Sequence, residues 1–297
     1  MLNLSGIYPP ITTPFNDDES LALNKLEDNL HQWARQPIAG VIMPGSNSES
    51  PYLSREEKIA IWQTCAAVLK PTGKRLIAGT GLESTRDTIE LTVKAAELGA
   101  EAALVLPPAF FKAQMNHDAL LAHYFAVADA SPIPLLVYNA PAFTGVDIQP
   151  ATLLALASHV RIIGAKDSSA NVVKIASVLA ARPDFQIFAG TASALLPFLS
   201  LGAVGGVMAL ANFAAVPLRR ILDAFLAGNM AEAQRIQLSV AEINAAVTSR
   251  FGVSGLKYAM DCCGFYGGPS RRPLQPAAAE MRAEIDRLLA KLEYQGT

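Results

Sequence analysis

The stretch Arg161-Ile-Ile-Gly-Ala-Lys-Asp-Ser-Ser169 joins a short apolar run to an abrupt polar end. Apolar residues follow one another without alternation, which is typical of a strand buried on both faces of a parallel sheet. Lys166 lies where that run ends. A lysine amine partly withdrawn from water gives up its proton more readily, and its lone pair can then attack a carbonyl carbon. Most strand-end lysines are merely solvated or paired, so the stretch alone predicts a parallel strand and a candidate nucleophile.

Similar β-type runs recur along the chain, and helical patterns separate them as far as about residue 228. The eight runs are Gly6–Thr13, Ala39–Met43, Arg75–Thr80, Ala102–Pro107, Pro134–Asn139, Arg161–Lys166, Gln186–Gly190 and Ala203–Met208. Eight successive strand and helix units predict an α/β fold of the (β/α)8 or TIM barrel type. An open doubly wound sheet is the alternative, and the absence of a G-x-G-x-x-G turn after the first strand disfavours it.

Helix signals support this division of the chain. Ser54-Arg-Glu-Glu57 has the form of a capping box, and Ser84 precedes a predicted helix on which Ile89, Val93 and Ala96 fall on one face and which stops at Gly99. After residue 228 only helices are expected, over 229–250, 253–263 and 276–294. We therefore predict a catalytic barrel over 1–228 and a C-terminal helical extension over 229–297, packed on the barrel or on a neighbouring subunit.

Composition excludes several classes of function. Of 297 residues, 51% are hydrophobic and 17% charged, with a net charge of −2, and no basic face suggests nucleic-acid binding. The charge-free stretch Ile187–Leu218 is broken by glycines and prolines, so a buried barrel segment explains it better than a membrane span. Cys65, Cys262 and Cys263 fit neither a disulfide framework nor a metal site, and no secretory signal is visible. These features predict a cytoplasmic protein without a metal.

Polar residues collect just after the predicted strands, at the end of a barrel where catalysis takes place. The groups are Gly45-Ser-Asn-Ser-Glu49, Tyr138-Asn-Ala-Pro141, Lys166-Asp-Ser-Ser169, Gly190-Thr-Ala-Ser193 and Gly205-Gly-Val207. A 2-oxo acid requires amides or hydroxyls for its carboxylate, an amine for its ketone and a movable proton. The first group, Lys166 and Tyr138 can supply these in turn.

Each of these residues also has a structural interpretation. The Gly45–Asn47 turn can simply cap the helix that begins near Ser54, and Tyr138 can be a core tyrosine whose hydroxyl bonds the backbone. Glu49 is interpreted as a hydrogen-bonding partner of the turn and not as a catalytic acid. The functional interpretation depends on all these groups meeting on one face of the barrel.

Three of the motifs, Gly45–Glu49, Tyr138–Pro141 and Gly164-Ala-Lys-Asp167, resemble the dihydrodipicolinate synthase / N-acetylneuraminate lyase family of class I aldolases, over nearly the whole chain. The resemblance implies a Schiff base on Lys166 with no other cofactor, and proton transfer by Tyr138. It also implies substrate binding by Ser46 and Asn47, a pocket lined near Gly190 and Val207, and a homotetramer.

Within the family, the chain is most similar to 4-hydroxy-2-oxoglutarate aldolases. The stretches that carry this likeness are Glu83-Ser-Thr85, Ala128–Pro134, Leu201–Gly206, Ala209–Asn212, Asn244–Thr248, Arg250-Phe-Gly252 and Gly267-Gly-Pro269. Phe143 stands where dihydrodipicolinate synthases have a carboxylate-binding arginine, and no acidic residue follows Gly190 as it does in sialic acid lyases. Phe110 or Phe111 replaces the tyrosine that a neighbouring subunit usually inserts, so Ser46 and the substrate carboxylate would complete the proton path.

The sequence thus predicts a class I aldolase that cleaves a 4-hydroxy-2-oxo acid, best matched by 4-hydroxy-2-oxoglutarate, to pyruvate and an aldehyde. Lys166, Tyr138 and Ser46 are the predicted catalytic residues. Asn47, Ser168 and Ser169 are candidates for the distal carboxylate. The alternatives are an aldolase for 2-keto-3-deoxy sugar acids, a dihydrodipicolinate synthase, and a silent barrel that binds a 2-oxo acid.

Overall fold

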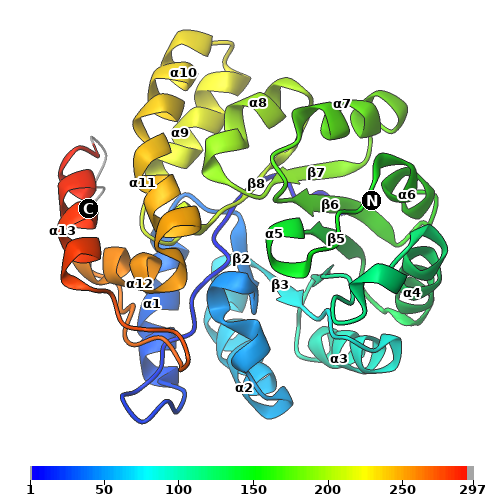
Figure 1. Cartoon of the computed structure of the whole chain (residues 1–297), viewed down its shortest axis with the longest axis horizontal. Coiled ribbons are helices and arrows are strands. Elements are labelled where there is room, and N and C mark those ends of the chain that lie inside the picture. The colour runs from blue at the N-terminus through cyan, green and yellow to red at the C-terminus, as the bar shows by residue number, and fades with distance from the viewer. Residues whose placement is uncertain (1, 293–297) are drawn as a thin grey trace.

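The computed structural model describes residues 2–292 and contains a barrel of eight parallel strands ringed by helices (Figure 1). The strands lie in the order β1-β8-β7-β6-β5-β4-β3-β2, and bonds from Ala39 to Ile7 and from Ile42 to Pro9 join β2 to β1. Their bounds are β1 Gly6–Tyr8, β2 Gly40–Met43, β3 Arg75–Gly79, β4 Ala102–Val105, β5 Leu135–Asn139, β6 Ile162–Asp167, β7 Gln186–Ala189 and β8 Gly205–Val207. The predicted barrel is confirmed.

The helices of the barrel are α1 Leu23–Arg35, α2 Arg55–Leu69, α3 Thr85–Glu97, α4 His117–Ala130, α5 Pro141–Thr144, α6 Pro150–Leu156, α7 Val172–Ala181, α8 Leu195–Ser200 and α9 Ala215–Leu226. The later helices are α10 Met230–Ser239, α11 Ala241–Ala245, α12 Gly252–Cys262 and α13 Ala279–Ala290, with a π-helix, η7, over Ala246–Arg250. Short 3-10 turns include η1 Ser46–Ser48 and η5 Ala192–Ala194. None of the helices described is long and apolar enough to cross a membrane.

The strands are apolar on both faces because each face meets a different core. One set of side chains fills the barrel interior, and the alternate set packs under the surrounding helices. Leu136 and Tyr138 of β5 belong to the inner set, while Leu135 and Val137 belong to the outer set. This division explains the uninterrupted apolar runs in the sequence.

A bulge in β6 determines where Lys166 points. Leu135 pairs with Ile162 but Leu136 pairs with Gly164, so Ile163 is an extra residue in the ladder. Because side chains alternate between faces, one inserted residue reverses the facing of every residue after it. The shift brings Lys166 level with Tyr138, which belongs to the inner set. Gly164 suits this strand because a Cβ there would collide with the Gln186 carbonyl oxygen.

The C-terminal helices pack along one side of the barrel, beside α1 and α9 in Figure 1. The Asn29 carboxamide of α1 accepts a bond from the Tyr266 N–H and donates one to the Tyr266 carbonyl, each at 2.8 Å. The expected packing of these helices on the barrel is therefore observed. The last predicted helix, 276–294, is observed over Ala279–Ala290, and residues 293 and 294 lie outside the described residues.

One boundary of the predicted elements is wrong. The first strand ends at Tyr8 and not at Thr13, because Pro9 and Pro10 lack the N–H groups that a ladder needs. On α3, Ile89, Val93 and Ala96 are all half-buried, and the fully buried positions are Thr88, Leu91, Thr92 and Ala95. The threonine hydroxyls bond carbonyls within their own helix, and this satisfies them in a buried position.

Candidate active site

Lys166 and Tyr138 lie side by side near the carboxyl ends of β6 and β5. They are partners in the parallel ladder, and both are almost fully buried, at 4% and 3% exposure. The Lys166 ammonium nitrogen is 4.0 Å from the centroid of the Tyr138 ring. Among residues 2–292, no carboxylate lies within ion-pair distance of this nitrogen. An aromatic ring in place of a carboxylate leaves the amine available to a substrate.

The Tyr138 hydroxyl faces Ser46 and not the backbone. Its oxygen is 3.3 Å from the Ser46 hydroxyl oxygen, which comes from the turn after β2. Burial raises the pKa of Tyr138, but the charge of Lys166 and hydrogen bonds from Ser46, Lys166 and Ser168 outweigh burial, and the net pKa is lowered. A phenol with a lowered pKa beside an amine is suited to proton transfer near neutral pH.

The turn that carries Ser46 is a separate 3-10 turn and does not cap the next helix. Ser46–Ser48 form η1, and α2 is capped by its own Ser54–Glu57 box, as predicted. The Ser48 hydroxyl donates to the Ile11 carbonyl and accepts from the Gly45 N–H. Asn47 is half-buried, and its side chain has no hydrogen-bond partner among the described residues. The side-chain polar groups of Ser46 and Asn47 are therefore not used to cap α2.

Glu49 anchors this turn to the C-terminal extension. It adopts a left-handed backbone conformation, with φ at 58°. Its carboxylate lies 2.7 Å from the Lys257 amine, and both side chains are fully buried. The other carboxylate oxygen accepts the Arg271 N–H at 2.8 Å. The sequence predicts the turn as the partner of this carboxylate, whereas its contacts are with Lys257 and Arg271 of the C-terminal extension.

The ends of β6 and β7 bring Ser168 and Gly190 into contact. The Ser168 N–H donates to the Asn139 carbonyl at 2.9 Å, and the Gly190 N–H donates to the Asp167 carbonyl at 2.7 Å. A Cβ on Gly190 would collide with the Ser168 hydroxyl oxygen, so this approach requires glycine. Val207 is buried at the end of β8, paired with Tyr8.

Ser169 does not join these residues. Its hydroxyl donates to the Asp167 carboxylate at 2.5 Å, and its N–H donates to the same oxygen at 2.9 Å. The only proton of this hydroxyl is therefore already used. Of the three candidates for a distal carboxylate, Ser169 is therefore committed to Asp167, and Ser168 hydrogen-bonds Tyr138.

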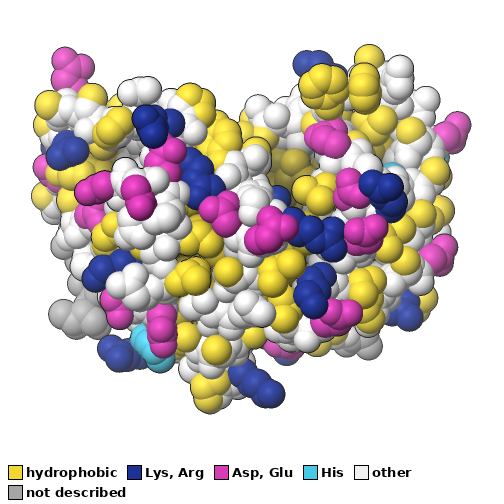
Figure 2. Space-filling model, turned by 90° about the horizontal axis from the view of Figure 1, so that it is seen from below, with side chains coloured by type: hydrophobic (Ala, Val, Ile, Leu, Met, Phe, Trp, Pro, Cys, Tyr) yellow, Lys and Arg dark blue, Asp and Glu magenta, His cyan; other side chains and the backbone are white. Residues whose placement is uncertain are grey.

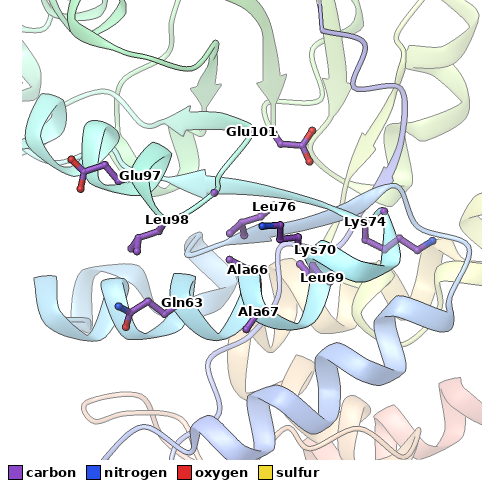
Figure 3. A pocket seen from close by; sticks show the side chains of 12 residues that line it. Gln63, Ala66, Ala67, Leu69, Lys70, Lys74, Leu76, Glu97, Leu98 and Glu101 are labelled. Atoms are coloured by element: carbon purple, nitrogen blue, oxygen red, sulfur yellow. The ribbon is translucent and has the colours of Figure 1, made fainter.

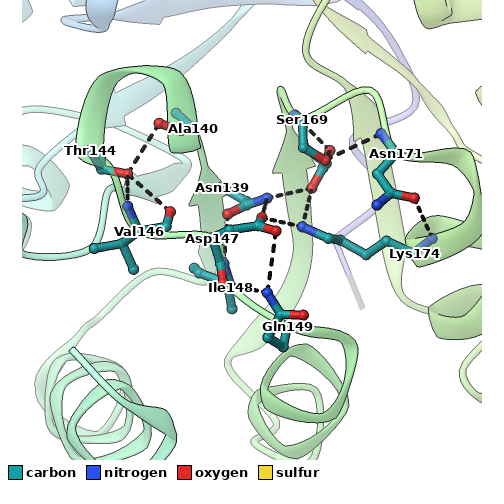
Figure 4. A network of polar contacts seen from close by, with 11 residues as sticks. Asn139, Ala140, Thr144, Val146, Asp147, Ile148, Gln149, Ser169, Asn171 and Lys174 are labelled. Atoms are coloured by element: carbon teal, nitrogen blue, oxygen red, sulfur yellow. Dashed lines mark hydrogen bonds and ion pairs between the residues drawn. The ribbon is translucent and has the colours of Figure 1, made fainter. Parts of the chain in front are cut away.

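A polar network that the sequence reading missed joins Asn139, Asp147 and Lys174 (Figure 4). The Asn139 carboxamide donates to Asp147 at 3.0 Å and to Asp167 at 2.7 Å. Lys174 of α7 is ion-paired with Asp147 and lies 3.9 Å from Asp167. Because Asn139 follows Tyr138 and Asp167 follows Lys166, the network ties together the strand ends that carry both. The sequence signal for this network was Lys174, a charged residue within the mostly apolar run of α7.

Phe110 and Phe111 follow β4 and are exposed to solvent, at 79% and 65%. Their rings pack edge to face with centroids 5.0 Å apart. The Glu83 carboxylate accepts the N–H groups of Ala109 and Phe110, each at 2.9 Å, and so holds the loop. Neither ring offers a hydroxyl, and neither reaches the Tyr138 and Ser46 pair within this chain.

A cavity of about 600 Å³ lies away from Lys166 (Figure 3). It is lined by α2, α3 and the amino ends of β3 and β4, including Leu76, Leu98 and Glu101. Lys166 and Tyr138 lie at the carboxyl ends of their strands, so this cavity belongs to the opposite end of the barrel. On the face shown in Figure 2, acidic and basic side chains are interspersed. Between residues 2 and 292, no three His, Cys, Asp or Glu side chains form a metal-binding group.

The model of the dihydrodipicolinate synthetase family matches residues 3–292. The chain belongs to this family. It is 36% identical to a probable mitochondrial 4-hydroxy-2-oxoglutarate aldolase of Emericella nidulans, over 94% of this chain and 92% of that protein. It is 33% identical to a 4-hydroxy-tetrahydrodipicolinate synthase of Methanothrix thermoacetophila, over 97% of this chain and 96% of that one.

Solved structures of the family share the fold. A dihydrodipicolinate synthase of Bacillus anthracis has a TM-score of 0.93 at 25% identity, over 98% of this chain and 99% of that one. A family protein of E. coli K12, solved in complex with pyruvate, has a TM-score of 0.91 at 28% identity, over 97% and 98% of the two chains. As a member of this family, the protein is a carbon–carbon lyase of the aldolase type.

Proposed function

We propose that the protein is a class I aldolase that cleaves a 4-hydroxy-2-oxo acid to pyruvate and an aldehyde through a Schiff base on Lys166. The observation that carries the proposal is the Lys166 amine, which is buried over the Tyr138 ring with no carboxylate beside it. Burying a cation without a carboxylate beside it lowers stability, and such a site persists where function requires it. No metal takes part in the proposed reaction.

The reaction begins when the Lys166 ammonium passes a proton to the Tyr138 phenolate and the free amine attacks the C2 ketone. Tyr138 returns that proton to the oxygen that leaves as water, which forms a protonated iminium. Tyr138, as the phenolate, takes the proton of the C4 hydroxyl, and the electrons of the C3–C4 bond move to the iminium. The aldehyde departs and an enamine of pyruvate remains. Protonation of C3 and addition of water then release pyruvate and free Lys166. Ser46 orients the Tyr138 hydroxyl across 3.3 Å and, with Asn47, binds the carboxylate next to the ketone.

The best matched substrate is 4-hydroxy-2-oxoglutarate, whose aldehyde product is glyoxylate. The 36% identical relative supports this choice through its name. Phe143 supports it as well, because its ring is 70% exposed and it stands where a dihydrodipicolinate synthase would place a carboxylate-binding arginine. A 2-keto-3-deoxy sugar acid is the second candidate, since that reaction uses the same iminium.

The homotetramer and the cytoplasmic location remain proposals. The exposed rings of Phe110, Phe111 and Phe143 favour a buried environment in an assembly, because large apolar side chains on a free surface are unfavourable. Size-exclusion chromatography with light scattering measures the mass of the assembly directly. A mass near four times 31.5 kDa supports the tetramer, and a monomeric mass contradicts it.

Turnover on matched substrates tests the function. Pyruvate release is followed with 4-hydroxy-2-oxoglutarate and with a 2-keto-3-deoxy sugar acid, and pyruvate consumption is followed in the condensation of pyruvate with aspartate semialdehyde. The proposal predicts the largest kcat/KM for the first substrate. A larger value for either of the others would reassign the substrate, and no turnover of any would leave a silent barrel.

A further inference from the structure

Asn244 is a residue of the C-terminal extension whose side chain reaches the end of β7. Its carboxamide nitrogen donates to the Thr191 hydroxyl at 2.9 Å and to the Ser193 hydroxyl at 2.8 Å. The side chain is only 2% exposed, and its carbonyl oxygen has no partner among the described residues. Leaving a buried oxygen unsatisfied costs stability, so packing alone does not account for an asparagine here.

The backbone around Asn244 is unusual in the same place. The α-helix α11 contains Asn244 and ends at Ala245, and the π-helix η7 begins at the next residue. A π-turn adds one residue to a helical turn and is found disproportionately at functional sites. The Thr248 hydroxyl, within η7, donates to the Asn244 carbonyl at 2.6 Å and so fixes the junction.

The contacts of Asn244 leave two hydroxyl protons available. The Thr191 and Ser193 oxygens each accept a hydrogen from Asn244, and neither hydroxyl has an acceptor for its own proton among residues 2–292. Thr191 is half-buried and Ser193 is exposed, so a ligand can reach them. No acidic residue occurs between Gly190 and Ser193. The pair therefore presents donors and no charged acceptor.

This pair lies beyond the site of chemistry along the strand ends. Lys166 pairs with Phe188 in the ladder, and Gly190 bonds Asp167 and touches Ser168. Thr191 is the next residue. A carboxylate only accepts hydrogen bonds and has two oxygens, which matches two adjacent O–H donors, whereas a sugar hydroxyl also needs an acceptor.

We propose that Thr191, Ser193 and Asn244 form a subsite for the distal carboxylate of a dicarboxylic 4-hydroxy-2-oxo acid, with Asn244 orienting the two hydroxyls. The inference rests on the proposed aldolase function and deepens it by assigning the substrate class to named residues. It also gives the C-terminal extension a direct part in substrate selection.

The test compares two substrates that differ only at the distal end. The selectivity is the kcat/KM for 4-hydroxy-2-oxoglutarate divided by that for 4-hydroxy-2-oxopentanoate, which carries a methyl group in place of the carboxylate. Thr191→Val combined with Ser193→Ala should lower this selectivity on the order of 10 to 100-fold. Asn244→Asp has the same shape but accepts both hydroxyl protons and adds a negative charge, so it should lower the selectivity further.

Ser200→Ala is the matched control, because its hydroxyl bonds the Leu196 carbonyl within α8, and it should keep the wild-type selectivity. Thermal unfolding checks that each variant is folded, and Asn244→Asp serves if the double variant is not. Unchanged selectivity in both Asn244→Asp and the double variant would overturn the subsite while the aldolase stands. If the wild-type protein forms no borohydride-trapped pyruvate adduct and cleaves neither substrate, the proposed function itself fails and the subsite with it.

Discussion

Lys166 and Lys174 are equally buried, at 4% exposure, yet their surroundings are opposite. Lys174, on α7, is held between the carboxylates of Asp147 and Asp167. Lys166, on β6, lies over the Tyr138 ring and has no carboxylate within ion-pair distance in the described chain. Burying a cation is costly unless an anion and hydrogen bonds compensate it. Lys174 therefore stabilises the fold, whereas the surroundings of Lys166 leave its amine available for a reaction.

The surroundings of Lys166 and Lys174 are connected through Asp167 and Asn139. Lys174 neutralises Asp167, whose backbone carbonyl receives the Gly190 N–H and whose carboxylate holds Ser169. Asn139 connects this network to the end of β5, directly after Tyr138. Lys174 therefore holds the ends of β5 and β6 in place, and these strand ends position Lys166 beside Tyr138.

Replacing Lys166 should have the largest effect on activity. Lys166→Met removes the nucleophile and should lower kcat by more than about 10⁴-fold, because the whole covalent route is lost. Its free energy of unfolding should be equal to or greater than that of the wild type, since an apolar chain replaces a buried amine that has no carboxylate partner. Steady-state turnover and urea unfolding measure the two quantities. A marked loss of stability would mean that Lys166 is a structural residue like Lys174.

Tyr138→Phe removes the phenol and keeps the ring beneath Lys166. Turnover should fall by about 10² to 10⁴-fold, the usual range for a general acid or base, while pyruvate still forms an adduct. Single-turnover kinetics with borohydride trapping separates the two steps. Unchanged turnover would place the proton donor elsewhere.

Lys174→Met should give the reverse of the Lys166→Met result. The variant leaves the buried Asp167 carboxylate uncompensated, which typically costs about 3–5 kcal/mol of unfolding free energy. The adduct on Lys166 should still form in the folded protein. Lys257→Met is the matched control, because it breaks another buried pair, with Glu49, at the junction with the C-terminal extension. If Lys174→Met were as stable as the wild type, the contrast between the two lysines would be lost.

Ser46→Ala tests the hydrogen bond to the phenol. The Ser46 hydroxyl helps to lower the pKa of Tyr138, so its removal should raise that pKa and leave less phenolate at a given pH. Turnover at neutral pH should fall about tenfold, and the phenolate should appear at higher pH in ultraviolet difference spectra. A spectrum that titrates as in the wild type would show that Ser46 does not act on Tyr138.

Replacing Asp147 should have the smallest effect, a change in stability that depends on pH in the acidic range. Burial raises the pKa of Asp147, but bonds from Lys174 and Asn139 outweigh burial and the net pKa is lowered. A lowered folded pKa contributes stability above the unfolded value of about 3.9, and this contribution disappears as the pH falls through the folded pKa. The difference in urea midpoint between wild type and Asp147→Asn should therefore be present at pH 6 and shrink towards pH 2. A constant difference would contradict this.

The barrel and the two central residues could be predicted from the sequence because they depend on short-range patterns. Eight apolar runs separated by helical patterns define the fold, and strand ends in a parallel barrel meet on one face. Lys166 ends such a run and Tyr138 is the residue before the end of another, so their meeting follows from topology. The family resemblance then assigned their roles, which stay predictions.

The missed features depend on tertiary contacts that no local pattern encodes. The bulge at Ile163 decides which face Lys166 occupies, and nothing in an apolar run marks the extra residue. The partners of Lys174 come from the segment after α5 and from β6, and Asn244 reaches Thr191 from the far end of the chain. On α3, the hydroxyls of Thr88 and Thr92 bond carbonyls of their own helix, which lets these polar residues be buried where an apolar pattern alone does not mark them.

Borohydride trapping with pyruvate, followed by peptide mass spectrometry, tests the central contrast most directly. The wild-type protein and Lys174→Met should each carry one reduced pyruvate adduct on Lys166, and Lys166→Met should carry none. An adduct on Lys174 or on any other lysine, or no adduct in the wild-type protein, would contradict the assignment of Lys166 as the reacting amine.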